Sequence, residues 1–161
     1  ERYNYSGYEL WCVSPVTGTN KGIDIILNDG FDYICHVDDD DYFLPNHIEV
    51  INTAIKETGK NFIHTTCKII RGDSEFIFPP ITENLYENII PKCERLAKCS
   101  TCINYRKIKF RPRNVFEEDG YHMVYDCDLW NRIGDSGEIG VKVNQVTVVN
   151  DDEKNIIRTE N

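Results

Sequence analysis

The chain lacks long hydrophobic runs, is poor in methionine and tryptophan, and has fewer basic than acidic residues. Its 161 residues include one Met, two Trp and 18 Lys or Arg against 27 Asp or Glu, which gives a formal net charge of −9. No apolar segment approaches the ~20 residues needed to cross a bilayer, so we expect no membrane span. The shortage of basic residues argues against a nucleic-acid partner, whose phosphates require a basic surface.

Linkers, repeats and low-complexity segments are also missing, so we find no internal boundary. The length is enough for one hydrophobic core, and we predict a single domain over 1–161 with a polar tail at 150–161. The chain starts ERYNYSGYEL, without an initiator Met and without a hydrophobic leader. We therefore expect a piece of a longer protein.

The seven cysteines form no regular framework. An odd number in an irregular arrangement favours a reducing compartment, and we expect a cytoplasmic protein. Cys93, Cys99 and Cys102 are spaced C-x5-C-x2-C, but a structural zinc site needs four ligands, and no fourth follows at a suitable distance. Zinc is therefore disfavoured.

Hydrophobic periodicity predicts alternating helices and strands in the first part of the chain. This alternation indicates an α/β domain with a partly parallel sheet, and residues 31–37 are apolar enough to be buried on both sheet faces. In residues 85–98 the periodicity is helical, but Pro91 should end or kink that helix. The expected helices are 20–27 with Asn20 as cap, 45–59, 85–98 and 125–133, and the expected strands are 8–14, 31–37, 61–70, 74–78, 100–110 and 139–149.

Four consecutive aspartates, Asp38 to Asp41, follow the predicted strand at 31–37. Carboxylates at the end of a buried strand lie at the sheet edge where open α/β sheets bind ligands, and oxygen ligands select Mg²⁺ or Mn²⁺. A calcium loop is excluded because Phe43 stands where that loop requires Gly. The acidic run by itself also suits a solvated surface turn.

Three ordered motifs resemble family 2 glycosyltransferases of the GT-A fold. Residues 34–49, ICHVDDDDYFLPNHIE, resemble the metal-binding segment of that family, and residues 19–23 match its upstream segment at three positions. Residues 125–133, YDCDLWNRI, are similar to its Glu-Asp-x-Asp-Leu-Trp-x-Arg segment, with Tyr125 in place of Glu. The family's front strands, which hold the nucleotide, have no counterpart in residues 1–16.

The resemblance implies an α/β fold of the GT-A (Rossmann-like) type, with a mixed, mostly parallel sheet flanked by helices and a shortened N-terminus. It implies a metal-dependent inverting transfer of sugar from a nucleotide-diphosphate donor to a glycan, lipid or protein acceptor. Mn²⁺ or Mg²⁺ would be the cofactor. A missing N-terminal segment or a partner domain would complete the nucleotide site.

The same resemblance assigns roles to individual residues. Asp126 would be the general base. Asp40 and Asp38 would hold the metal, and together with Asn20 they would contact the donor. Acceptor-binding candidates are Asp41, Asp128 and His122.

The roles of Asp126 and Asp128 and the function itself each have an alternative interpretation. Asp126 also suits a helix cap, and Asp128 also suits an ordinary pair with Arg132 four residues later. The alternative function is a catalytically incomplete glycosyltransferase-like module that binds or supports a larger assembly. A nuclease-type metal domain is a third interpretation, but it lacks a basic channel.

Overall fold

A computed structural model describes residue 7 and residues 12–39, 41–118 and 123–151. Its helices are α2 (Pro15–Asn28), α3 (His47–Thr58), α4 (Val115–Glu118) and α5 (Tyr125–Asp135), with 3₁₀ turns η1 (Cys93–Arg95) and η2 (Lys98–Ser100). Its strands are β1 (Tyr33–Cys35), β2 (Asp41–Phe43), β3 (Phe62–Arg71), β4 (Ser74–Phe78), β5 (Tyr86–Ile89), β6 (Thr101–Asn104) and β7 (Gly140–Asp151). Among these helices, none is long and apolar enough to cross a membrane.

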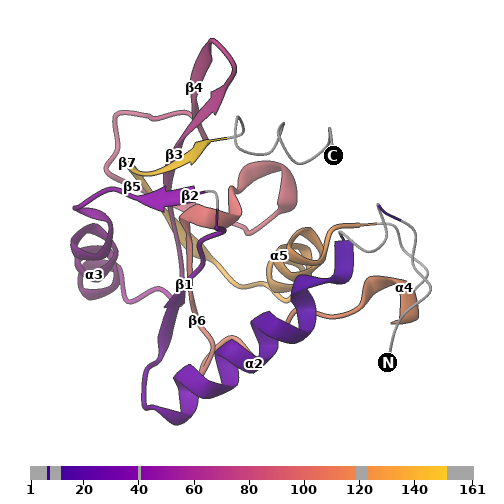
Figure 1. Cartoon of the computed structure of the whole chain (residues 1–161). Coiled ribbons are helices and arrows are strands. Elements are labelled where there is room, and N and C mark those ends of the chain that lie inside the picture. The colour runs from indigo at the N-terminus through magenta and orange to yellow at the C-terminus, as the bar shows by residue number, and fades with distance from the viewer. Residues whose placement is uncertain (1–6, 8–11, 40, 119–122, 152–161) are drawn as a thin grey trace.

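The described strands form one curled, seven-stranded mixed sheet in the order β1-β6-β3-β7-β2, with β4 paired to β3 and β5 to β7 (Figure 1). Five of its six pairings are antiparallel, and β3–β7 is parallel. The predicted GT-A (Rossmann-like), mostly parallel sheet is therefore wrong. Parallel neighbours need crossover connections, usually helical, whereas β6 lies antiparallel to both β1 and β3.

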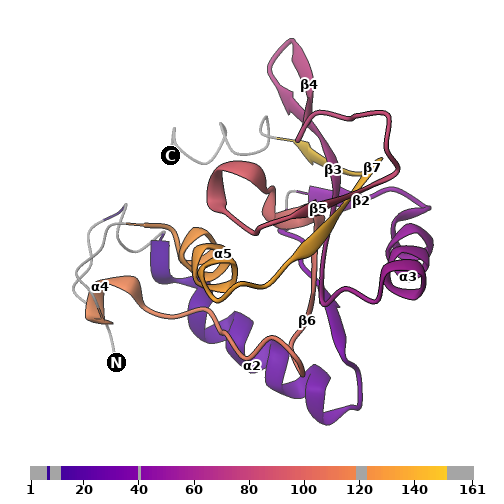
Figure 2. The same cartoon turned by 180° about the vertical axis from the view of Figure 1, so that it is seen from behind.

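Helices lie on both sides of the sheet (Figures 1 and 2). Helix α3 covers one face, where Ile51 and Ala54 meet Ile63 of β3 and Cys102 of β6. Helices α2 and α5 lie on the other side, in a core that joins Ile23 and Trp130 to buried residues of β1, β3 and β6. The two faces of β1 and β6 therefore belong to different environments.

Several predicted elements are confirmed. The predicted helix at 20–27 lies inside α2, the one at 45–59 is α3, and the one at 125–133 is α5. Gly59 ends α3 in the left-handed conformation, with φ of 64°, as a C-terminal glycine should. The strands expected at 31–37, 74–78 and 100–110 contain β1, β4 and β6, and those expected at 61–70 and 139–149 cover β3 and β7 except for their last one and two residues.

Two predicted elements and one predicted cap are wrong. Residues 85–98 form β5, η1 and η2 instead of a helix, because Pro91 interrupts the helical hydrogen-bond pattern. In the predicted strand at 8–14, residues 12 and 13 are helical, and residues 8–11 lie outside the described part. Asn20 lies in the interior of α2, which begins at Pro15, so it is not the cap.

Helix α5 approaches the backbone of Pro91, which lies between β5 and η1, so closely that residue 134 has to be glycine. A Cβ added to Gly134 would lie 2.1 Å from the carbonyl oxygen of Pro91. We expect Gly134→Ala to lower the free energy of unfolding by about 1–3 kcal/mol, as overpacking of a core does. Gly22→Ala is the matched control, because α2 leaves open space there. Removing a helix-interior glycine should stabilise by about 0.5–1 kcal/mol. Urea unfolding of both variants measures the difference, and equal effects would contradict the close contact.

Candidate functional site

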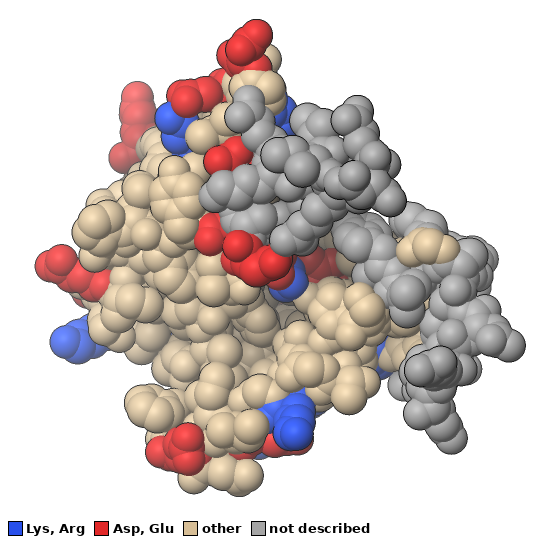
Figure 3. Space-filling view, viewed as in Figure 1, with Lys and Arg blue, Asp and Glu red and all other residues tan. Residues whose placement is uncertain are grey.

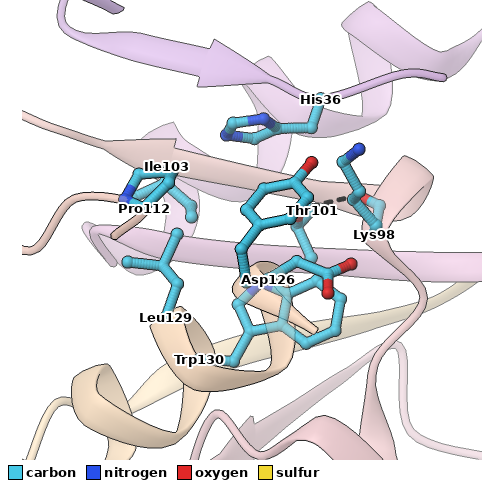
Figure 4. Close-up of a pocket in the computed structure, with 9 residues that line it drawn as sticks. His36, Lys98, Thr101, Ile103, Pro112, Asp126, Leu129 and Trp130 are labelled. Carbon is cyan, nitrogen blue, oxygen red and sulfur yellow. Dashed lines mark hydrogen bonds between the residues drawn. The ribbon is translucent and has the colours of Figure 1, made fainter. Parts of the chain in front are cut away.

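The candidate site lies between the end of β1, the turn η2 and the first turn of α5. Its lining includes His36, Lys98, Tyr125 and Asp126, with apolar groups such as Trp130 behind them. Figure 4 shows Asp126 on α5 and His36 on the strand side, turned toward the same space, with Lys98 beside them. Segments about 90 residues apart in sequence therefore converge here.

Lys98 contacts both acidic motifs, the one at residues 38–41 and the one at residues 125–133. Its ammonium group forms a salt bridge with Asp38, and its Nζ lies 5.1 Å from the centre of the Tyr125 ring. Burial opposes the charge on Lys98, but Tyr125 and Asp38 outweigh it and raise the pKa of the lysine. Lys98 therefore stays protonated at neutral pH. Figure 3 shows acidic side chains beside a basic one near the middle of this face.

Asp126 is the second residue of α5, after Val124 at the N-cap position. Its Oδ1 accepts a hydrogen bond from the backbone N–H of Cys127 at 2.8 Å, so Asp126 satisfies a free N–H of the first turn, as the helix-cap alternative expects, although Val124 holds the N-cap position itself. Burial raises the pKa of Asp126, with a further contribution from the charge of Asp38, while Lys98 and the Cys127 N–H oppose the rise. A carboxylate with a raised pKa is a stronger base than an exposed one, which suits proton abstraction near neutral pH.

His36 contributes a neutral imidazole to this site. Its Nε2 is hydrogen-bonded to the Tyr105 hydroxyl at 2.9 Å. Burial and the nearby charge of Lys98 lower the pKa of His36 to about 4. The histidine therefore carries no charge at neutral pH and can act as a hydrogen-bonding group beside Asp126.

The other residues predicted for the donor and acceptor lie in different places. Asn20 donates from Nδ2 to the carbonyl oxygen of Pro112 at 2.8 Å, so it holds the backbone of a residue that lines the site. Asp41 belongs to β2, where its carboxylate accepts a hydrogen bond from Asn150. Asp40 and His122 are outside the described residues.

Asp128 is buried between two arginines. Its carboxylate binds Arg113 through Nε and Nη2 at 2.9–3.2 Å and Arg132 at 2.7–2.8 Å. The pairing of Asp128 with Arg132 is confirmed, but the pair is not the ordinary surface pair that was expected, because Asp128 is buried. Burial opposes ionisation here, but the two guanidinium groups outweigh it and lower the pKa of Asp128. Because the cations surround this carboxylate, it has a structural part in joining α5 to the segment around Arg113.

The described residues fit a divalent cation only in part. Asp38 offers carboxylate oxygens of the kind that Mg²⁺ and Mn²⁺ prefer, but Lys98 already binds one of them. Within residues 12–39, 41–118 and 123–151, no group of three His, Cys, Asp or Glu side chains is arranged to hold a metal ion. The described part of the chain therefore makes no complete metal centre.

The cysteines of the C-x5-C-x2-C pattern lie apart. Cys93 forms a disulfide with Cys127, which ties η1 to α5 beside Asp126. Cys99 lies with its Sγ 3.7 Å from that of Cys67, and Cys102 is opposite Cys35 in the sheet. The three cysteines therefore have three different partners.

Lys98 is expected to set the basicity of Asp126. In Lys98→Met, the pKa of Asp126 should rise further, because a neighbouring positive charge is removed and the charge of Asp38 is no longer offset. A carboxyl ¹³C NMR titration measures this change. Lys21→Met, an exposed substitution on α2, is the control. An Asp126 pKa that stays constant or falls in Lys98→Met would contradict the arrangement.

Comparison with known proteins assigns no relative. No protein-family model matches this sequence, and none of the curated proteins matches it. Two residues that line the site, Lys98 and His36, carry no signal of this role in the sequence: Lys98 stands at the end of the helix expected at 85–98, which does not form, and His36 lies in an apolar predicted strand. No local pattern marks either residue, because both are recruited by contacts between distant segments.

Proposed function

We propose that this chain transfers a sugar from a nucleotide-diphosphate donor to an acceptor hydroxyl, with Asp126 as the general base. The observation that carries the proposal is that Lys98 forms a salt bridge with Asp38 of the first acidic motif and lines the same pocket as Asp126 of the second. A solvated acidic turn would not need a half-buried cationic partner from another segment. A half-buried carboxylate of raised pKa in the same pocket as a lysine is suited to proton transfer.

The proposed step is a single displacement. The acceptor hydroxyl binds Asp126, its oxygen attacks the anomeric carbon, and the bond from that carbon to the diphosphate breaks. The hydroxyl proton passes to the Asp126 carboxylate, and the leaving group carries the negative charge away. Lys98 would offset that charge as it develops, and attack opposite to the leaving group inverts the anomeric centre.

We propose Mn²⁺ or Mg²⁺ as the cofactor, which Asp38 and Asp40 would hold. When bound, such a cation supplies charge neutralisation for a diphosphate. The donor would be a nucleotide sugar and the acceptor a glycan, lipid or protein, with a further segment or partner domain completing the nucleotide site.

A second candidate function is a glycosyltransferase-like module without independent catalysis. The Lys98–Asp38 salt bridge favours it, because this bridge occupies a carboxylate that the metal would need.

Either function would be carried out in the cytoplasm. A thiol count on protein purified from cytosol checks this location, since a reducing compartment should leave Cys93 and Cys127 as free thiols.

Nucleotide titration separates the two candidates. We expect UDP, GDP or dTDP to bind more tightly with Mn²⁺ than without it, and Asp40→Ala and Asp38→Ala to lose this metal dependence. Asp24→Ala, an exposed change on α2, is the matched control and should bind like the unmodified chain. Absence of metal-dependent nucleotide binding by the intact chain would favour the non-catalytic module.

A further inference from the structure

A second group of reactive side chains lies on the α3 face of the sheet, away from Asp126. It consists of Cys35 on β1, Cys102 on β6 and His47 in the first turn of α3. Ile34 and His36 face the α5 side, so the alternation of a strand turns Cys35 toward α3. Of the free cysteines in the described residues, Cys35 is partly exposed and the other four are buried.

The sheet places Cys35 and Cys102 directly opposite each other. The adjoining His36 N–H donates to the carbonyl oxygen of Thr101 at 3.1 Å, so the Cys35–Cys102 pair is a non-hydrogen-bonded pair. In such pairs the Cα atoms are typically about 4.5 Å apart and the side chains are close. That separation is within the range in which a disulfide forms.

The hydrogen bonds of His47 leave one ring nitrogen for Cys35. His47 is 1% exposed, and its Nδ1 is 2.8 Å from the Thr147 hydroxyl, which itself donates to Thr65. Nδ1 therefore carries a proton and donates to Thr147, which leaves Nε2 as the second ring nitrogen. Nε2 is buried without a hydrogen-bond partner among the described residues.

The neighbours of Cys35 favour its thiolate form. A hydrogen bond from Cys102 lowers the pKa of Cys35, burial opposes this, and the neighbouring His47 lowers it further, to about 6. The same interaction and burial raise the pKa of Cys102. The titratable groups beside Cys35 are Cys102 and His47, and Tyr33 and Tyr86 pack against the same cluster. The buried residues of the cluster other than Cys102 are apolar, such as Ile51 and Ile63.

We propose that Cys35 is a modification site for hydroperoxides and other small electrophiles, with Cys102 as its resolving thiol and His47 as its positioning base. Cys35 has a second thiol directly opposite it on β6 and a neighbouring histidine that Thr147 orients, and these are features of an activated nucleophile. The site is independent of the proposed sugar transfer, because it lies on the other face of the sheet.

The proposed chemistry with a hydroperoxide balances in two steps. The Cys35 thiolate attacks the peroxide, an S–O bond forms, the O–O bond breaks, and hydroxide leaves. The Cys102 sulfur then attacks the sulfenic acid, an S–S bond forms, the S–O bond breaks, and the departing hydroxide takes the Cys102 proton to give water. The two sulfurs are oxidised and the peroxide oxygens are reduced to water.

Alkylation of the full chain with iodoacetamide tests the nucleophile. Peptide mapping should show Cys35 modified before the four buried thiols, with a rate that rises with pH around a midpoint near 6. In Cys102→Ala and His47→Gln this midpoint should move up, and the rate at pH 6 should fall about tenfold as the thiolate fraction decreases, after allowing for greater nucleophilicity. Cys99→Ala should leave the Cys35 rate unchanged. A midpoint above about pH 8 in the unmodified chain would overturn the proposal.

Hydrogen peroxide tests the resolving step. One equivalent should give a Cys35–Cys102 cross-linked peptide, and Cys102→Ala should instead give a sulfenic acid that dimedone traps on Cys35. Cys67 and Cys99, with sulfurs 3.7 Å apart, provide an internal comparison, because both are buried. Oxidation of Cys67 and Cys99 ahead of Cys35 and Cys102 would overturn the proposal.

Discussion

Asp126→Asn is expected to lower kcat for sugar transfer by a factor of about 10²–10⁴ while nucleotide binding stays near that of the unmodified chain. General-base catalysis typically contributes this range, and an amide cannot accept the acceptor proton. The substitution preserves size, and the Asn oxygen can still accept the hydrogen bond from Cys127 N–H. A loss confined to kcat would therefore report on proton transfer.

The control for Asp126→Asn lies on the same helix. Asp135→Asn changes an exposed carboxylate that pairs with Lys92 at the other end of α5, and it should leave kcat within about twofold, as expected for a screened surface pair. The pH profile gives a second measurement. Because the pKa of Asp126 is raised, activity should decline as pH falls through a value above that of an ordinary aspartate. Full transfer activity in Asp126→Asn would show that another group is the base.

Asp128→Asn should destabilise the fold by about 3 kcal/mol. The carboxylate is 7% exposed and binds Arg113 and Arg132, whose side chains are 26% and 22% exposed. Removing one partner of a buried ion pair leaves the others uncompensated, which typically costs about 3–5 kcal/mol, and partial exposure of the arginines reduces that somewhat. Urea or thermal unfolding measures the change, and a loss below about 1 kcal/mol would place Asp128 among ordinary surface pairs.

The ion pairs of Asp128 with Arg113 and Arg132 also make the stability of the fold depend on pH. The pKa of Asp128 is lower in the folded chain than in the unfolded chain. Its contribution is therefore fully present above the unfolded value, about 4, and is lost as pH falls through the folded value. Asp128→Asn should flatten this acid-side loss. Parallel unfolding curves for Asp135→Asn provide the control, since that carboxylate is exposed.

The sequence predicted the local elements with a clear pattern. Helix α3 begins soon after Pro45 and ends at Gly59, and α5 begins at Tyr125, because helix starts and stops depend on neighbouring residues. The helix predicted at 85–98 does not form, and part of the reason lies outside the segment. Its helical spacing of apolar residues is overridden by Pro91 and by pairing of β5 with β7, a strand more than 50 residues away.

The sequence likewise points to some residues of the candidate site and not to others. Asp38 and Asp126 are candidates because each is part of a recognisable motif, whereas Lys98 and His36 have no such motif and reach the same place only through η2 and the end of β1. Asp128 was assigned two possible roles, and the contact with Arg113, 15 residues earlier, decided in favour of the ion pair.

The sequence by itself determined the acidic run after a strand, the helices α3 and α5, and the cysteine-rich composition that places a thiol on β1. Only the tertiary structure decided the direction of the strands, the Lys98–Asp38 salt bridge, and the pairing of Cys35 with Cys102. The physical reason is the range of the interactions. Periodicity and capping act between residues a turn or two apart, whereas strand pairing and buried charge depend on segments that meet only when the chain folds.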